Sequence, residues 1–121
     1  MKVKEIMQTN LYSLAPSHTV REAAKIIGEK DVGSVLIIKE GKLVGIFTER
    51  DLARLIAKGV SLDTPLEKVM TKNLITIGPE DSLIKATCKM IEHDIRHLPV
   101  VNENGELLGI ISNRDILKNL I

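Results

Sequence analysis

The sequence has few of the residues on which several functions depend. Its 121 residues include no Trp, one Tyr, one Phe and one Cys. So few aromatic side chains provide almost no platforms on which single-stranded nucleic acid could stack. A lone cysteine excludes an internal disulfide and fits a reducing compartment. Hydrophobic residues still make up 44% of the chain, which is typical of a globular protein, so Ile, Leu and Val must form the core.

A large net charge and long apolar runs are also lacking. The 17 basic and 16 acidic residues leave a net charge of +1. A basic surface that would attract DNA, RNA or anionic lipid is therefore not expected. No stretch approaches the roughly 18 apolar residues of a membrane span, and the opening MKVKEIMQTN has no apolar signal core. We expect a cytoplasmic protein that binds neither nucleic acid nor membrane.

What the sequence does contain is an internal repeat. An offset of 63 residues superimposes Met7 on Met70, Pro16 on Pro79, and SVLII on HLPVV. After one inserted residue, Gly41, Leu43, Gly45, Ile46, Arg50 and Asp51 recur as Gly105, Leu107, Gly109, Ile110, Arg114 and Asp115. One unit of about 60 residues is marginal alone, so two copies that share a core are more stable. We expect units at 1–59 and 66–121, joined by a linker at 60–65.

Periodicity within each copy predicts the same order of elements. Two stripes at helical spacing follow the capping residues Thr19 and Ser82, namely Val20, Ala23, Ala24 and Ile27 in the first copy and Leu83, Ala86, Thr87 and Met90 in the second. Two β-branched runs around a turn predict hairpins over 34–47 and 97–111, and 49–59 and 113–121 read as closing helices. Short apolar runs at 11–14 and 74–77 add a strand to each copy.

These elements indicate an α/β (α+β) fold of two β-α-β-β-α units. Because the hairpin strands are apolar on both faces, both faces must be covered. Helices can cover one face, and the sheet of the other copy is the natural cover for the second. The sequence therefore predicts two units packed sheet to sheet about a pseudo-twofold axis, with two equivalent clefts.

The most specific repeated motif is TERD at 48–51 and SNRD at 112–115. Each stands where a strand ends and a helix begins, so its hydroxyl and its acid can form a capping box without any further function. Capping alone does not require the arginine present in both copies. A helix start, a hydroxyl and arginine suit a phosphate, and an acceptor-only aspartate suits ribose hydroxyls. The motif is thus compatible with a helix cap, a ribonucleotide site, or both.

With these motifs in place, the chain resembles a tandem CBS-domain pair, or Bateman module. The resemblance covers nearly the whole chain. It rests on the openers VKEIM and LEKVM, the prolines before the first helices, HLPVV, and Gly-x-x-[Ser/Thr]-x-x-Asp endings. It implies a non-enzymatic regulatory module of the free-standing type, with no cofactor, that binds AMP, ADP, ATP or S-adenosylmethionine between its copies. It also implies a homodimer and leaves room for a protein partner that the sequence does not identify.

The resemblance also assigns residues to the ligand. The positions concerned are Ser13, Leu14, Ser34, Val35, Thr48, Arg50, Asp51, Thr76, Ile77, Arg96, His97, Leu98, Ser112, Arg114 and Asp115. The two aspartates would bind ribose, and the hydroxyls of Thr48 and Ser112 would bind phosphate or ribose. Residues 13–14 would line the adenine pocket of the Asp115 site, and residues 76–77 that of the Asp51 site. Positions 34–35 and 97–98 would form the floors.

The two predicted clefts differ in their chemistry. Arg96 and His97 offer basic groups to a phosphate, whereas Gly33 and Ser34 at the equivalent positions do not. We therefore expect the clefts to bind ligand unequally.

Other reactive residues are weaker candidates. His93 and His97 have the spacing of helical metal ligands, but Pro99 and the strand pattern indicate that the helix ends between them, so no metal site is expected. Cys88 has no base positioned by the sequence and is expected to be a partly buried structural residue. No catalytic arrangement can be assigned. Two alternatives to ligand sensing stay open: a scaffold or dimerisation module that holds no ligand, and, less favoured, a nucleic-acid-binding regulator.

Overall fold

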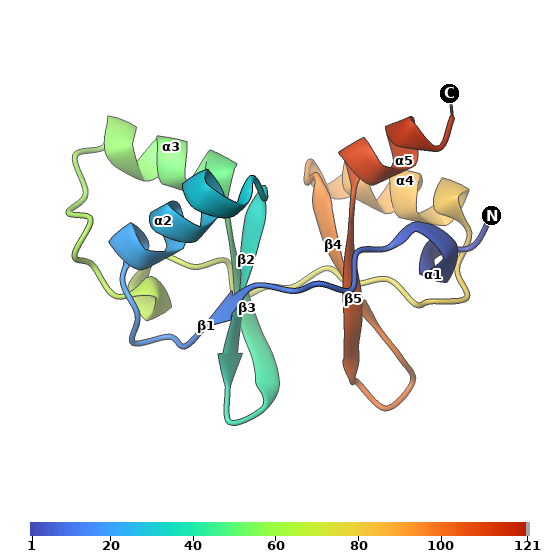
Figure 1. Cartoon of the computed structure of the whole chain (residues 1–121), viewed down its shortest axis with the longest axis horizontal. Helices are drawn as coiled ribbons and strands as arrows, with labels where there is room; N and C mark the ends of the chain where they lie inside the picture. The colour runs from blue at the N-terminus through green and yellow to red at the C-terminus, as the bar shows by residue number, and fades with distance from the viewer. Residues whose placement is uncertain (121) are drawn as a thin grey trace. The chain divides into compact units, whose positions relative to one another are not determined.

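The computed structural model describes residues 1–120, and these form two compact units (Figure 1). One unit, here the Asp51 unit, is Tyr12–Leu74. The other, here the Asp115 unit, combines Met1–Leu11 with the chain from Ile75 onward. Each unit is therefore built mainly from one sequence repeat but takes its opening segment from the other. The division into repeats at 1–59 and 66–121 stays a prediction about the sequence, since packing follows different boundaries.

The Asp51 unit has a three-stranded sheet of order β1-β2-β3. Strand β1 (Ser13–Leu14) lies parallel to β2 (Ser34–Lys39), which lies antiparallel to β3 (Lys42–Thr48). Helices α2 (Val20–Lys30) and α3 (Glu49–Ala57) lie together beside the sheet, and the 3-10 helix η1 (Leu66–Lys68) closes the unit (Figure 1). Phe47, with no exposed surface, lies in the middle of its otherwise aliphatic core.

The Asp115 unit repeats this design with one strand reduced. It contains α1 (Val3–Ile6), α4 (Leu83–His93), β4 (His97–Val101), β5 (Leu107–Ser112) and α5 (Asn113–Lys118). Strands β4 and β5 form an antiparallel hairpin. The strand predicted at 74–77 is only a single parallel bridge between Ile77 and Val100. The predicted fold of mixed helices and strands is confirmed; the last residue of the predicted closing helix lies outside the described residues.

Local sequence explains the matching helix boundaries. The Thr19 hydroxyl accepts a hydrogen bond from the Glu22 N–H at 3.2 Å, and Ser82 caps α4 in the same way. Helices α2 and α4 both end at an aspartate in the left-handed region, Asp31 and Asp94, with φ of 53° and 50°. Short polar side chains tolerate this conformation better than bulky ones. The two copies thus start and stop their helices with the same chemistry.

The exchanged opening segments are held by backbone pairing to a hairpin strand. In the Asp115 unit, Gln8 and Ile110 exchange N–H···O bonds of 2.8 and 3.0 Å. In the Asp51 unit, Thr71 and Ile46 exchange bonds of 3.0 and 3.1 Å. The glycine just before each strand partner, Gly109 or Gly45, leaves the space in which the opening segment lies. The small residue of the motif is therefore required by the chain's own packing.

Among residues 1–120, no helix has the length and apolar character needed to cross a bilayer.

Gly109→Ala should destabilise the protein more than Gly45→Ala. A Cβ at position 109 would lie 2.7 Å from the Gln8 carbonyl oxygen, which the ladder holds in place. At position 45 the nearest atoms belong to the flexible Met70 side chain. We expect Gly109→Ala to cost about 1–3 kcal/mol in urea denaturation, as overpacking usually does.

Gly28→Ala is the matched control, because Gly28 lies within α2 and a Cβ there meets nothing within 4 Å. This variant should stabilise the protein by about 0.5–1 kcal/mol through helix propensity. Equal behaviour of all three variants would show that the opening segments are not tightly held.

Candidate functional site

The two repeated motifs form nearly identical helix starts. In the Asp51 unit, the Thr48 hydroxyl accepts a hydrogen bond from the Asp51 N–H at 3.2 Å. Asp51 Oδ2 in turn accepts from the Thr48 N–H at 2.9 Å and from the Thr48 hydroxyl at 3.0 Å. Ser112 and Asp115 repeat all three bonds at the same distances. The capping-box interpretation is confirmed, and the shorter aspartate closes the box as glutamate normally does.

The two carboxylates differ in what else they bind. Asp115 is only 8% exposed, and its Oδ1 accepts a hydrogen bond from Gln8 Nε2 at 3.1 Å. Asp51 is half-buried, and within residues 1–120 its carboxylate accepts hydrogen bonds only from Thr48, through Oδ2. Gln8 was missed by sequence reasoning. The repeat alignment pairs Gln8 with Thr71 directly after the matched methionines, but it does not connect Gln8 to Asp115.

Each motif lies directly beside a residue of the same unit that was predicted to form the floor of a ligand cleft. Ser34 is the register partner of Thr48, and His97 is the register partner of Ser112. The first helical N–H groups are used by neighbouring carbonyls: Glu49 donates to Gly33, and Asn113 donates to Arg96. The structure thus gathers a hydroxyl, a carboxylate and one further polar side chain at each helix start.

Other predicted positions contribute mainly to the core. The side chains of Val35 and Leu98 have no exposed surface, and Ile77 has 2%. Both backbone polar groups of Ile77 are used in pairing with Pro99 and Val101. These side chains pack in the hydrophobic core of their unit, so a ligand could contact them only if the core opened.

The residues predicted to line the adenine do not belong to the unit that contains the motif to which they were assigned. Ser13 and Leu14 belong to the same unit as Asp51, and Thr76 and Ile77 to that of Asp115. Their assignment to the motif of the other unit stays a prediction. The carbonyl of Thr76 already accepts a hydrogen bond from Lys89 Nζ at 2.6 Å.

The structure also shows where the weaker candidate residues, His93, His97 and Cys88, lie. Helix α4 ends at His93 and β4 begins at His97, as expected from Pro99. Within residues 1–120, no group of three or more His, Cys, Asp or Glu side chains could hold a metal ion. The expectation that Cys88 is partly buried was wrong, since it is exposed on α4. The helical stripe that buries Met90 and Ala86 turns Cys88 outward.

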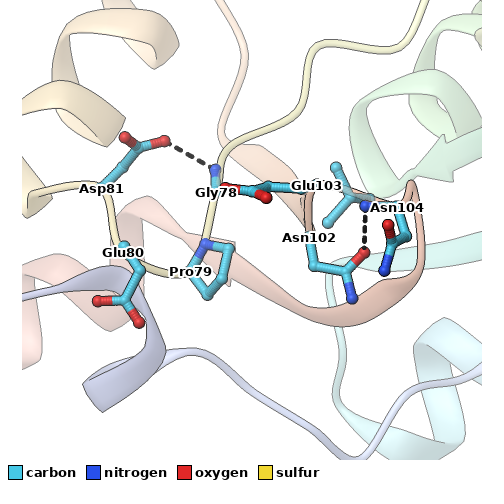
Figure 2. A pocket seen from close by; sticks show the side chains of 8 residues that line it. Gly78, Pro79, Glu80, Asp81, Asn102, Glu103 and Asn104 are labelled. Atoms are coloured by element: carbon cyan, nitrogen blue, oxygen red, sulfur yellow. Dashed lines mark hydrogen bonds between the residues drawn. The ribbon is translucent and has the colours of Figure 1, made fainter.

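A separate pocket of about 580 Å³ lies in the Asp115 unit between residues 78–81 and 101–104 (Figure 2). Two of the acids that line it, Glu80 and Asp81, already have partners. Hydrogen bonds from Lys2 and Lys4 lower the pKa of Glu80 to about 2, and those from the Gly78 N–H and then Lys85 lower the pKa of Asp81. The pocket includes neither repeated motif, and the carboxylates of Glu80 and Asp81 are committed to holding α1 and the start of α4.

The chain matches a known protein family along most of its length. The CBS domain model matches twice, at residues 3–58 and 66–121. The chain belongs to the CBS-domain family. The CBS domain-containing protein YhcV of Bacillus subtilis is 36% identical over 118 residues, which cover 97% of this chain and 84% of YhcV.

Two solved CBS structures with bound adenosine compounds are similar throughout. The CBS domain pair of protein MJ0100, in complex with 5′-methylthioadenosine and S-adenosyl-L-methionine, is 30% identical with a TM-score of 0.91. The alignment covers 99% of this chain and 95% of that one. The CBS domain protein PAE2072 of Pyrobaculum aerophilum, complexed with AMP, is 32% identical with a TM-score of 0.89, over 99% and 98% of the chains. The tandem CBS fold expected from the sequence is therefore confirmed.

Asp115→Ala should cost more stability than Asp51→Ala. Removing Asp115 leaves three donors without their acceptor, namely the Ser112 N–H, the Ser112 hydroxyl and Gln8 Nε2, in a nearly buried place. We expect about 2–3 kcal/mol for Asp115→Ala and about 1–2 kcal/mol for Asp51→Ala in urea denaturation.

Asn113→Ala, an exposed change in the same helix, should stay within about 0.5 kcal/mol of the parent. If Asp51→Ala proves the costlier of the two acidic substitutions, the contact between Gln8 and Asp115 adds no stability.

Proposed function

We propose that this chain is a non-enzymatic regulatory module that binds an adenosine ligand, either an adenine nucleotide or S-adenosylmethionine. The observation that carries the proposal is its similarity, over nearly the whole length, to CBS proteins solved with AMP and with S-adenosyl-L-methionine. The repeated helix starts supply chemistry that suits such ligands. The proposal places the protein in the cytoplasm, where these compounds are abundant.

Asp51 is the group best suited to ribose. One of its oxygens holds Thr48, and the other accepts no hydrogen bond from residues 1–120. An ionised carboxylate only accepts hydrogen bonds, so adjacent ribose hydroxyls are well-matched donors. The helix keeps its cap while the ligand binds, because different oxygens serve the two tasks.

The groups around this carboxylate are suited to bind the phosphate. Helix α3 begins at Glu49 and carries a partial positive charge at that end. The Thr48 hydroxyl and Arg50 belong to the same turn, and arginine pairs well with phosphate. Ser112, Arg114 and Asp115 have the corresponding roles in the second motif, with His97 and Arg96 as additional basic groups. Ser13, Leu14, Ser34 and Thr76 complete the proposed ligand environment, and Val35, Ile77 and Leu98 support it from the core.

Regulation follows from differential affinity. A ligand can shift a conformational equilibrium only by as much as it prefers one state over another. The proposed output is a change in how the module engages a second protein, whose identity the chain does not reveal.

A second candidate function is self-association without a ligand. Helix α4 exposes Ile84 and Ile91, which are 77% and 75% exposed, with Cys88 between them on the same stripe. At the equivalent positions, α2 carries Arg21, Lys25 and Gly28. An apolar stripe of this kind on one repeat only favours a homodimer through α4, and a scaffold would need no more than this.

Adding AMP, ADP, ATP, S-adenosylmethionine or 5′-methylthioadenosine should raise the melting temperature. A ligand at about 100 times its Kd stabilises a single site by about 2.7 kcal/mol. Replacing ribose by 2′-deoxyribose should weaken binding at least several-fold, because Asp51 loses a donor. Differential scanning fluorimetry and isothermal titration calorimetry measure both effects.

Glu49→Gln is the matched control for Asp51→Asn, since it removes an exposed acid from the same helical turn. Only Asp51→Asn should reduce affinity for the ribose ligand. No response to any of the five compounds would favour the scaffold, and equal affinity for the deoxy form would contradict the role given to Asp51.

Ile84→Lys and Ile91→Lys should convert a dimer into monomers in analytical ultracentrifugation. Both put a charge into a stripe that a symmetric dimer would bury. Glu29→Lys on α2, another exposed helical position, is the control and should leave the association unchanged. A wild-type chain that is monomeric throughout the micromolar range would refute this dimer.

A further inference from the structure

The opening segment of the chain makes a side-chain contact that its repeat counterpart cannot make. Gln8 Nε2 donates a hydrogen bond of 3.1 Å to Asp115 Oδ1. The residue in the same place beside the other motif is Thr71, which is too short to imitate a glutamine amide. The two motifs are otherwise alike in distances and in capping. This contact is therefore one feature that distinguishes the two carboxylates within their own units.

The backbone at these two positions is the same in both units. Gln8 pairs with Ile110 in both directions, and Thr71 pairs with Ile46 in both directions. Each follows a methionine that lies against the motif glycine, Met7 against Gly109 and Met70 against Gly45. The main chain is thus held by the ladder whatever the side chain, so glutamine and threonine can be exchanged without disturbing the pairing.

The Gln8 amide occupies the acceptor that a ribose hydroxyl would use. Asp115 Oδ2 already accepts from the Ser112 N–H and the Ser112 hydroxyl, so Oδ1 is its remaining oxygen. An amide N–H and a ribose O–H are both donors to the same carboxylate. A ligand at Asp115 therefore competes with Gln8 for Oδ1, whereas a ligand at Asp51 meets no such competitor among residues 1–120. Gln8 itself is largely exposed, so its side chain can swing away.

We propose that Gln8 determines which motif binds the ligand, by acting as an internal competitor that covers the Asp115 carboxylate. The Asp51 motif then takes the adenosine ligand first, and the Asp115 motif binds only after Gln8 is released. This inference rests on the proposed function and adds to it the order and inequality of the two sites. Because a hydrogen bond to a charged group has to be broken, affinity at Asp115 is lowered roughly ten- to a hundredfold.

The test exchanges the two residues and follows AMP binding to the full chain by isothermal titration calorimetry. Each motif is isolated by inactivating the other, with Asp51→Asn or Asp115→Asn as the background. In the Asp51→Asn background, Gln8→Thr should raise AMP affinity about tenfold or more. In the Asp115→Asn background, Gln8→Thr should change nothing, which makes it the matched control. Thr71→Gln should weaken AMP binding at the intact Asp51 motif.

Gln8→Ala shows whether a rise in affinity with Gln8→Thr comes from loss of the glutamine amide or from a new contact between threonine and the ligand. It removes the same donor and should raise affinity at Asp115 as Gln8→Thr does. A rise with threonine alone would overturn the inference, and so would equal AMP affinities of the two motifs in the parent chain. If AMP and the other four compounds bind to neither the parent nor the variants, the proposed function fails and the inference fails with it. Thermal melts of every variant confirm that the chain is folded.

Discussion

The structure depends on one backbone interaction that is made twice. Gln8 pairs with Ile110 and Thr71 pairs with Ile46, so that each hairpin receives the opening segment of the other repeat. A unit of about 60 residues buries too little surface to be stable by itself. Exchanging the openers gives each unit part of its core, since Val3 and Leu66, both fully buried, come from these segments. It also ties the two repeats into one protein, because neither unit is complete without the chain of the other. The glycine of the repeated motif is explained by this exchange.

The helix-start aspartates combine stability with a proposed role in binding. A carboxylate that reaches back to its own N-cap is held in one rotamer, which is the condition for presenting its other oxygen to a ligand in a fixed direction. Capping and recognition are thus two uses of one geometry. The same bonds are expected to stabilise both helix starts even when no ligand is present.

Duplication made the two units alike, and single residues made them different. Gln8 and Thr71 occupy the same backbone position, yet only the longer side chain reaches a carboxylate. Ile84 and Ile91 make α4 apolar where α2 carries Arg21 and Gly28. Lys2 and Lys4 hold Glu80 and fasten α1 in the Asp115 unit. These differences lie on positions that the shared backbone leaves unconstrained, and there one repeat can change without disturbing the other.

The sequence by itself determined the repeat, the order of helices and hairpins, the capping residues and the family, because these follow from local periodicity and from motifs written twice. Even the end of α4 before His97 could be read from Pro99. Tertiary structure alone decided which opening segment joins which hairpin, since an exchange between two similar repeats satisfies every local pattern equally well. It also decided that Cys88 is exposed, that Val35 and Leu98 are core residues, and that Gln8 lies on Asp115. That last contact joins residues 107 positions apart, and no spacing rule connects them. Only the folded ladder brings the two side chains together.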